Sequence, residues 1–349
     1  MYKGRGAQIQ VKNRFLKHEY VQEHLEAIDE FDEEAPPSKY IPIFPKTIVN
    51  KVESPDVGMD YSINPYQGYE HGCIYCYARN SHEYWGYNAG LDFERVILYK
   101  ENAPLLLEKH FQKPTWSPAT IVLSGNTDCY QPLERKKKIT RGMLEVFLKY
   151  KNPVGIITKN SLITRDLDIL GELSDNTLTT VLFSITSLKE EVRRKLEPRT
   201  ATAKQKLKAI EKMSKRGIPV RVMIGPVIPG LNDHEIPEIM EAGSNAGAIG
   251  VGYTMIRLNG QIGEVFTNWV EQAFPDRADK IINQIKGAHG GKLNDSRFGN
   301  RMRGEGKMVQ SISRMFEISK AKYFGNKPKP PKLRTDLFVK TNRGQMGLF

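Results

Sequence analysis

Six short apolar runs, rich in β-branched residues and separated by helix-like stretches, constrain the fold of this chain more than any other feature. The runs occupy residues 61–65, 119–123, 154–158, 180–185, 220–224 and 249–256. Such alternation is typical of βα units around a parallel sheet. The expected fold is therefore α/β, a partial (β/α)6 barrel of TIM type. In barrels of this kind, catalytic residues gather where strands end and loops begin.

Helix-like stretches between the runs lie at residues 139–150, 188–216 and 234–245. Thr140 is predicted to open the first, and Asn232 or Asp233 to open the last. Side-chain oxygens of these residue types accept hydrogen bonds from the free backbone N–H groups at a helix start.

Two segments flank the barrel region, which we place at residues 56–310. Residues 1–55 combine a polar start, an acidic stretch and several prolines, and they predict an N-terminal arm that wraps the barrel. Residues 311–349 are expected to hold the end of a helix, a basic linker and a short terminal peptide. The linker contains Lys327-Pro328-Lys329-Pro330-Pro331, a composition typical of extended chain.

Charge and composition bear on partners and location. The net charge is +12, and the segment from Lys320 to Arg343 has eight basic residues and one acidic residue, Asp336. Such a tail can neutralise nucleic-acid phosphates or simply aid solubility, and both interpretations stay open. No apolar run is long enough to span a membrane, and the first ten residues lack the apolar core of a secretory signal. A cytoplasmic protein without membrane contact is expected.

Three cysteines, Cys73, Cys76 and Cys129, make a poor disulfide framework for 349 residues, so reduced thiols are expected. Cys73 and Cys76 follow the first apolar run at a two-residue spacing, in a loop with glycines and aromatic residues. Such a pair can hold a metal ion or supply neighbouring ligands of an iron–sulfur cluster. Zinc would need a second pair of ligands, and apart from His82 none follows nearby.

The wider segment from Asn64 to Arg79 resembles the cluster loop of radical SAM enzymes, in particular the branch similar to spore photoproduct lyase. That branch has the pattern C-x3-C-x2-C, with an aromatic residue before the last cysteine. Cys73 and Cys76 match its second and third cysteines, and Tyr75 matches the aromatic residue that packs beside the adenine. The resemblance implies a barrel of the radical SAM type, a [4Fe–4S] cluster and S-adenosylmethionine as cofactors, and a reductant such as flavodoxin or ferredoxin as partner.

Tyr69 stands where that pattern has its first cysteine. Three thiolates ordinarily hold three irons and leave the fourth open for S-adenosylmethionine, so two thiolates leave a further iron without a protein ligand. His71 and Cys129 are candidate substitutes, and ligation by the Tyr69 phenolate is a third alternative. A free cysteine such as Cys129 is more often simply buried.

Later segments extend the resemblance along the barrel. In the family, the equivalents of residues 123–134 bind the methionyl amino group, and those of 224–233 bind adenine. Residues 184–187 lie at the expected ribose or carboxylate position, and residues 197–200 lie where the family often places groups for the nucleoside and carboxylate. Thr158-Lys159 and Arg165-Asp166 are similar to the family as well. Each assignment has a structural alternative. For residues 123–134 it is a capped turn, for Arg199 an ordinary surface ion pair, and for residues 224–233 a purely structural turn. The residues assigned in this way to the cofactor are Tyr75, Ser124, Gly125, Asn126, Thr127, Asp128, Lys159, Ser184, Thr186, Arg199, Gly225 and Ile228.

The resemblance implies generation of a 5′-deoxyadenosyl radical on or near DNA, in nucleic-acid repair or modification. The alternative, supported by Tyr69, is a catalytically degenerate DNA-associated binding protein with an incomplete cluster site. Residues 294–306 concentrate arginine and glycine around Phe298, which suits either a nucleic-acid surface or a solvated loop. Finally, Gln345 to Phe349 resemble the short peptide with which bacterial repair and replication proteins bind the DNA sliding clamp, a further expected partner.

Overall fold

The structure is a computed structural model that describes residues 4–15 and 37–340. Within these residues, the main sheet has the strand order β10-β9-β8-β7-β6-β3-β2. Its strands are β2 (Asn50–Lys51), β3 (Tyr61–Ile63), β6 (Ile121–Leu123), β7 (Val154–Thr158), β8 (Thr179–Ser184), β9 (Val220–Val227) and β10 (Gly250–Met255). All neighbours from β3 to β10 pair parallel, whereas β2 is an antiparallel edge. The six predicted strands and the partial barrel are confirmed.

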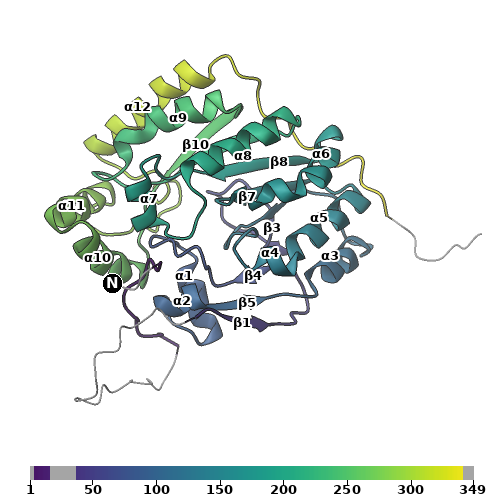
Figure 1. Ribbon diagram of the computed structural model, residues 1–349, viewed down its shortest axis with the longest axis horizontal. Coiled ribbons are helices and arrows are strands. Elements are labelled where there is room, and N and C mark those ends of the chain that lie inside the picture. Colours follow the sequence, from purple (N-terminus) through teal and green to yellow (C-terminus); the bar gives the residue numbers. More distant parts are fainter. Residues whose placement is uncertain (1–3, 16–36, 341–349) are drawn as a thin grey trace, which may run out of the picture.

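Helices connect these parallel strands and lie side by side along the sheet (Figure 1). They are α5 (Ile139–Tyr150), α6 (Leu167–Asp175), α7 (Glu190–Leu196), α8 (Ala203–Lys215) and α9 (Ile236–Asn245). In α5, buried apolar residues recur at three- and four-residue intervals, as in Met143, Phe147 and Tyr150. This spacing places them on one face, which packs on the core.

The other elements surround this framework. A small sheet with the order β1-β5-β4, which the sequence patterns did not predict, consists of β1 (Lys39–Pro42), β5 (Val96–Tyr99) and β4 (Tyr66–Gln67). The remaining α-helices are α1 (Arg79–His82), α2 (Leu91–Arg95), α3 (Ala103–Phe111), α4 (Glu134–Lys137), α10 (Ile262–Ala273), α11 (Ala278–Ala288) and α12 (Lys307–Phe324). Short 3-10 helices are η1 (Glu83–Trp85), η2 (Ser161–Asp166), η3 (Asp233–Glu235) and η4 (Pro275–Arg277).

The predicted helix over 188–216 is wrong as one element, because the chain breaks it between α7 and α8. Pro198 lies two residues beyond the end of α7, directly after the capping residue Glu197, and has no N–H to continue the helical hydrogen bonds. A new helix then starts at Thr202, whose side chain accepts from the Gln205 N–H while the Gln205 side chain accepts from the Thr202 N–H. This reciprocal pair is a capping box.

The predicted helix caps are also wrong. Lys138, with a left-handed φ of 52°, precedes α5, and the Thr140 hydroxyl donates instead to the Cys129 carbonyl. Asn232 holds the preceding loop, because its side chain accepts from the Ile228 N–H and donates to the Thr186 carbonyl. The Asp233 carboxylate accepts from the Gly230 N–H. All three side chains stabilise a strand-to-helix loop rather than the helix start.

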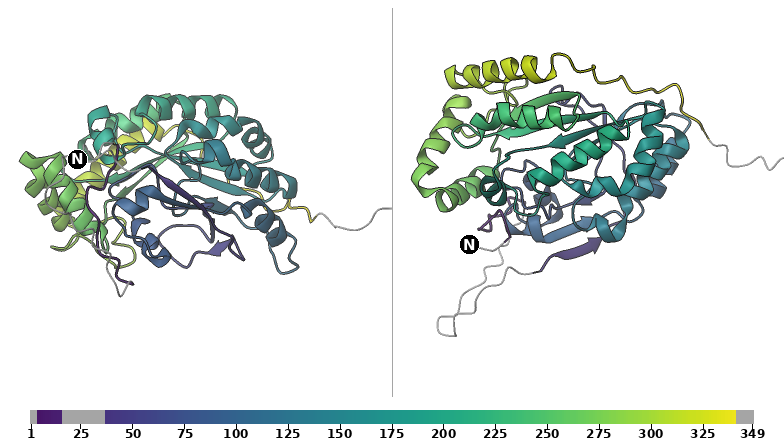
Figure 2. Two further views of the ribbon diagram at one scale, coloured as in Figure 1. Left: turned by 60° about the horizontal axis from the view of Figure 1, so that its bottom comes forward. Right: turned by 45° about the horizontal axis from the view of Figure 1, so that its top comes forward.

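Residues 325–340 form an extended segment, which we call the strap, and it packs along the barrel instead of projecting from it (Figure 2). Phe338 contacts the rings of Phe111 and Tyr150, with centroids 5.8 and 6.3 Å away. The N–H groups of Arg334 and Val339 donate to the carbonyls of Thr177 and Tyr150. Because Thr177 and Tyr150 precede β8 and β7, the strap crosses the amino ends of these strands.

The N-terminal residues 4–15 also contact the barrel. The N–H groups of Gly6 and Ala7 donate to the Glu94 carboxylate at 2.9 and 2.7 Å, and the Asn13 side chain donates to the Glu83 and Tyr87 carbonyls. Across the described part of the chain, no helix combines the length and apolar character needed to cross a membrane. Gln345 to Phe349 lie outside the described residues.

Candidate functional site

Polar groups from three neighbouring strands meet at the carboxyl end of the sheet, which we call the mouth. Lys159 directly follows β7, Ser184 ends β8, and Gly225 lies in β9. The Lys159 ammonium donates to the Ser184 hydroxyl and to the Gly225 carbonyl, the latter at 3.3 Å. The Ser184 hydroxyl donates to the same carbonyl at 3.1 Å. A cation and a hydroxyl are therefore held together where a carboxylate or ribose could bind.

Glu197 holds Lys159 and its neighbours at the mouth in place. The sequence patterns did not single it out as a site residue. Its carboxylate is fully buried, and it lies 3.2 Å from the Lys159 ammonium and 3.0 Å from that of Lys206. It also accepts from the hydroxyls of Tyr75 and Thr186. Burial acts to raise the pKa of Glu197, but the two lysines outweigh it and hold this pKa well below its ordinary value. Glu197 thus stays ionised and fixes Lys159, Tyr75 and Thr186.

The cysteine loop closes one side of the mouth. Cys73 and Cys76 are buried and free, and burial raises the pKa of both thiols. Arg79, fully buried, fixes the loop by donating to the Cys73 carbonyl at 2.9 and 3.2 Å and to the Glu94 carboxylate. A guanidinium presents several donors in a rigid fork, so one side chain can hold several backbone carbonyls.

Tyr69 lies in the same loop with only 4% of its surface exposed. Its ring packs edge-to-face on His71, with centroids 5.0 Å apart, and its N–H donates to the Phe93 carbonyl at 2.7 Å. Burial, followed by the charge of Cys73, raises the pKa of Tyr69 well above its ordinary value. In this arrangement Tyr69 is a neutral phenol.

His71 is buried beside the cysteine loop. The Asn160 amide oxygen already accepts from the Leu162 N–H, so the amide nitrogen faces the His71 Nε2 atom at 3.0 Å and donates to it. The proton of the neutral ring is then on Nδ1, which has no hydrogen-bond partner within the described structure and lies 3.8 Å from the Asp128 carboxylate. Burial lowers the pKa of His71 to about 4, so the ring is neutral at pH 7. As the side chains stand, the Nε2 lone pair is used by the Asn160 hydrogen bond.

Cys129 belongs to the apolar core between the sheet and helices, whereas Cys73 and Cys76 belong to the core around the cysteine loop. In residues 4–15 and 37–340, no three His, Cys, Asp or Glu side chains gather closely enough to hold a metal ion. The chain therefore offers two of the three thiolates that a [4Fe–4S] cluster with one open iron ordinarily uses. The residues present do not fit such a cluster as they stand.

The loop after β6 uses its predicted site residues largely within the protein. Thr127 donates to the Tyr66 carbonyl at 2.6 Å, and the Asn126 N–H donates to the Asn64 side chain at 2.7 Å. The Asp128 carboxylate accepts from the Thr158 hydroxyl and the Lys159 N–H. These bonds are those of a capped turn, which ties the β6 loop to the end of β7.

Four other predicted residues of the site have distinct surroundings. Arg199 donates to the Gly4 carbonyl at 3.1 Å, and its guanidinium lies 3.5 Å from the Glu70 carboxylate. Ile228 is buried, and its N–H donates to the Asn232 side chain at 2.7 Å. Ser124, with a left-handed φ of 73°, accepts from the Cys129 N–H, and Gly125 carries the carbonyl that accepts from Tyr77.

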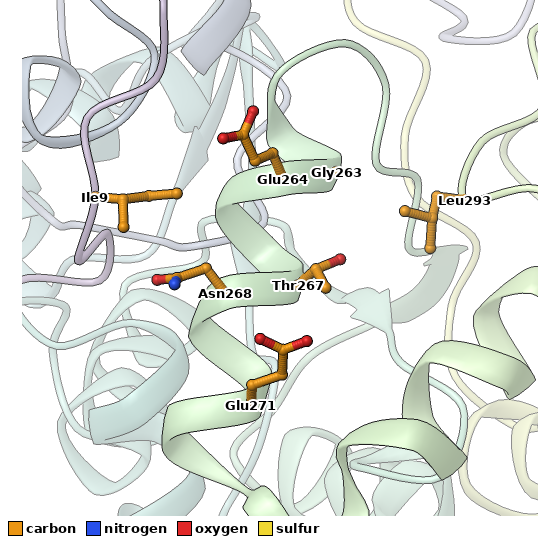
Figure 3. A pocket seen from close by; sticks show the side chains of 7 residues that line it. All are labelled: Ile9, Gly263, Glu264, Thr267, Asn268, Glu271 and Leu293. Carbon is orange, nitrogen blue, oxygen red and sulfur yellow. The ribbon is translucent and has the colours of Figure 1, made fainter.

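A hollow of about 420 Å³ lies on the surface along α10, and it contains none of the predicted site residues. Figure 3 shows Ile9 and Leu293 on opposite sides of this helix. Glu264 and Glu271 line the hollow without any basic side chain, which does not suit an anionic ligand. The mouth remains the candidate site.

Comparisons with known proteins agree with this geometry. The family model described as Radical SAM superfamily matches residues 63–243, more than half of the chain. An uncharacterized protein of Mycobacterium bovis is 31% identical over 234 residues, which cover 66% of this chain and 69% of that protein. An uncharacterized protein of Methanocaldococcus jannaschii is 28% identical over 246 residues, covering 70% of this chain and 87% of the relative.

Solved structures of spore photoproduct lyase share the fold. One mutant aligns over 87% of both chains with a TM-score of 0.58 and 15% identity. Another, solved with bound AdoMet and a dinucleoside spore photoproduct, aligns over 82% of this chain and 79% of its own, with a TM-score of 0.57 and 15% identity. Members of the matched family bind a [4Fe–4S] cluster and S-adenosylmethionine. The family match over residues 63–243 and the 31% identical relative show that this chain belongs to the radical SAM superfamily.

Proposed function

We propose that the protein binds S-adenosylmethionine at the mouth and acts on or near DNA, in nucleic-acid repair or modification. The observation that carries this proposal is the convergence of Lys159, Ser184 and Gly225, held in place by the ionised Glu197. A fixed cation suits the carboxylate of the cofactor, and strand-end hydroxyls suit its ribose. The solved lyase that holds AdoMet and a dinucleoside lesion supports the same assignment by analogy of fold.

If a cluster is completed, it would supply an electron for the reductive cleavage of S-adenosylmethionine. In this chain Cys73 and Cys76 would be the ligands, and an exogenous group would have to complete the set. A reductant such as flavodoxin or ferredoxin and a cytoplasmic location belong to the proposal, because the three cysteines are all free.

Tyr69 favours a second candidate function, a DNA-associated binding protein that keeps the barrel without radical chemistry. The ring is buried and packed on His71, and no other described side chain supplies the third ligand. The two candidates share cofactor binding and differ in cluster assembly.

Anaerobic reconstitution with iron and sulfide tests both candidates. We compare the unchanged chain, Tyr69→Cys and the matched control Tyr69→Phe, measuring iron content, S-adenosylmethionine binding and 5′-deoxyadenosine release after reduction. Tyr69→Cys is expected to raise iron content and release 5′-deoxyadenosine, because it supplies the absent thiolate. Equal release by the unchanged chain would favour the first candidate and remove Tyr69 as a lesion. Release by Tyr69→Cys alone would show that the unchanged chain lacks radical chemistry and favour the second, and absence of S-adenosylmethionine binding in all three would overturn cofactor binding at the mouth.

A further inference from the structure

Arg257 is a partly buried cation two residues beyond the carboxyl end of β10. Among the described residues no carboxylate lies within ion-pair distance of it, although the Asp56 carboxylate is close enough to act on it electrostatically. Its guanidinium carbon lies 5.9 Å from the centre of the Tyr77 ring. Burial and the nearby charge of Arg301 lower the pKa of Arg257. The Asp56 carboxylate, which pairs with Arg301, offsets this repulsion between the two cations only in part, so the position remains favourable for a further anion beside Arg257.

Arg301 and Phe298 lie beside Arg257, in the loop between α11 and α12. The Asp56 carboxylate pins this loop, accepting from the Gly299 N–H at 2.9 Å and from the Arg301 guanidinium at 2.5 Å. On the other side, the Met302 carbonyl accepts from the Met255 N–H of β10 at 2.9 Å. The loop is thus fixed at two points, and its conformation does not depend on burying Phe298.

Phe298 is nevertheless exposed over 61% of its surface, with the Arg301 guanidinium 4.4 Å from its ring centre. Tyr77 is 46% exposed, although its hydroxyl donates to the Gly125 carbonyl and so fixes the ring. Two fixed, exposed rings and two guanidinium groups therefore lie together, and we call Tyr77, Arg257, Phe298 and Arg301 the rim cluster. Tyr77 follows directly on Cys76, which places the cluster beside the cysteine loop.

The rim cluster also has a defined place in the sheet. Asp56, which holds Arg301, lies between β2 and β3 at one edge, and Arg257 follows β10 at the other edge. The hydrogen bond between Arg301 and Asp56 therefore joins the two edges of the sheet at the cluster. Tyr77 donates to the Gly125 carbonyl beyond β6, and Arg257 lies beyond β10, so both reach the cluster from carboxyl ends of strands.

We propose that the rim cluster binds single-stranded nucleic acid, with Arg257 on a backbone phosphate and Phe298 stacked on an unpaired base. The proposal rests on the proposed action on nucleic acid and adds the class of substrate. A guanidinium pairs with a phosphate through two parallel hydrogen bonds, and an aromatic ring stacks on any base that has left a duplex. Bases inside an intact duplex offer no free face, so a duplex would have to extrude a base to use the same site.

Binding of a labelled single-stranded oligonucleotide and of its blunt duplex, measured by fluorescence anisotropy at several salt concentrations, tests this inference on the full chain. Arg257→Gln should weaken single-strand binding about tenfold and lower the salt slope by about one, because one phosphate contact is lost. Phe298→Ala should weaken it roughly 5- to 150-fold with an unchanged salt slope, because only stacking is lost. The unchanged chain should prefer the single strand.

Matched controls separate the cluster from general charge and apolar effects. Arg334→Gln removes a basic side chain on the strap, and Phe44→Ala removes a phenylalanine that is 68% exposed elsewhere. Both should bind like the unchanged chain, and Arg257→Lys should keep the salt slope while losing affinity. Single-strand binding that Arg257→Gln and Phe298→Ala leave unchanged would overturn this inference while the proposed function stands. Failure of the unchanged chain to bind either oligonucleotide would overturn both.

Discussion

Glu197 shows how one buried charge can organise the mouth. Two lysines and two hydroxyls converge on a carboxylate that has no exposed surface. Removing one member of a buried ion pair leaves the other charge without compensation, which costs more than the pair itself contributes. Loss of the Glu197 charge is therefore expected to lower the stability of the fold as well as cofactor binding.

Glu197→Gln should lower the free energy of unfolding by about 3–5 kcal/mol, because Lys159 and Lys206 lose their anion. Urea denaturation at neutral pH measures the change. Glu190→Gln is the matched control, since Glu190 pairs with Arg193 and Arg194 near the surface. This substitution should lower the free energy of unfolding by less than about 1 kcal/mol. Similar losses in both variants would contradict the organising role of Glu197.

His82 gives the protein a defined pH dependence. Burial lowers the pKa of His82 from 6.5 to about 4, and the ring packs between Tyr87 and Phe93. Because the folded value is below the unfolded one, stability is fully present above pH 6.5 and falls as the pH drops from 6.5 towards 4. At pH 5 this linkage should cost about 2 kcal/mol relative to pH 7.

His82→Phe should remove that part of the loss, because a phenyl ring fits the same aromatic packing without titrating. Urea denaturation at pH 7 and pH 5 makes the comparison, with the exposed His234→Gln as the control that keeps the pH dependence of the unchanged chain. The explanation fails if His82→Phe loses as much stability between the two pH values as the unchanged chain does.

The three cysteines should differ in their importance for iron. Cys73→Ala or Cys76→Ala is expected to abolish iron binding after reconstitution, because each removes one of only two thiolates in the loop. Cys129→Ala should change iron content much less, because that thiol lies in the other apolar core. Iron analysis of the three purified variants decides, and an equal loss in all three would make Cys129 a ligand.

At the scale of elements, strongly periodic segments were predictable and loops were not. The six strands and α5 were found because their apolar spacing reports burial directly. The break in 188–216 was missed, although Pro198 and the Thr202–Gln205 box mark it in the sequence. The small sheet was missed because β4 has two residues and β1 has four, too few for a period to appear.

The candidate site could also be predicted only in part. Lys159, Ser184 and Gly225 were assigned through the family resemblance, and they meet because parallel strands end at one edge of the sheet. Glu197 lies in the segment 197–200 named by the resemblance, but its own role was not foreseen, because its ion pair with Lys206 joins a loop and a helix that share no local pattern. Arg199, two residues beyond Glu197, contacts the N-terminal arm instead, since Pro198 redirects the chain. Pairings across the fold of this kind depend on tertiary geometry.

At the scale of the whole molecule, the strap and the mouth lie at opposite ends of the barrel. The strap crosses the amino ends of β7 and β8, and the ammonium of Lys340 donates to the Pro114 carbonyl at that same end. The mouth lies at the opposite, carboxyl end. Nine residues can span at most about 30 Å, so a partner bound to the residues after Lys340 would lie nearer to the amino ends of the strands.

Gln345 to Phe349 are expected to bind the bacterial sliding clamp, with Leu348 and Phe349 in an apolar pocket and Gln345 hydrogen-bonding at its edge. Burial of the two apolar side chains contributes roughly 3–6 kcal/mol before ordering costs, enough for a weak contact that tethering on DNA would strengthen. The alternative is that this apolar tail packs on its own barrel. The strap disfavours it at one position, because Phe338 already packs against Phe111 and Tyr150 there.

Deleting residues 345–349 should therefore abolish clamp binding, measured by surface plasmon resonance, and leave iron content and melting temperature unchanged. Phe338→Ala provides the opposite control, because it should lower the melting temperature by removing the aromatic contacts of the strap and still allow clamp binding. If the deletion lowers the melting temperature while clamp binding persists, the last five residues are part of the strap, and the argument that they bring the barrel to DNA is lost.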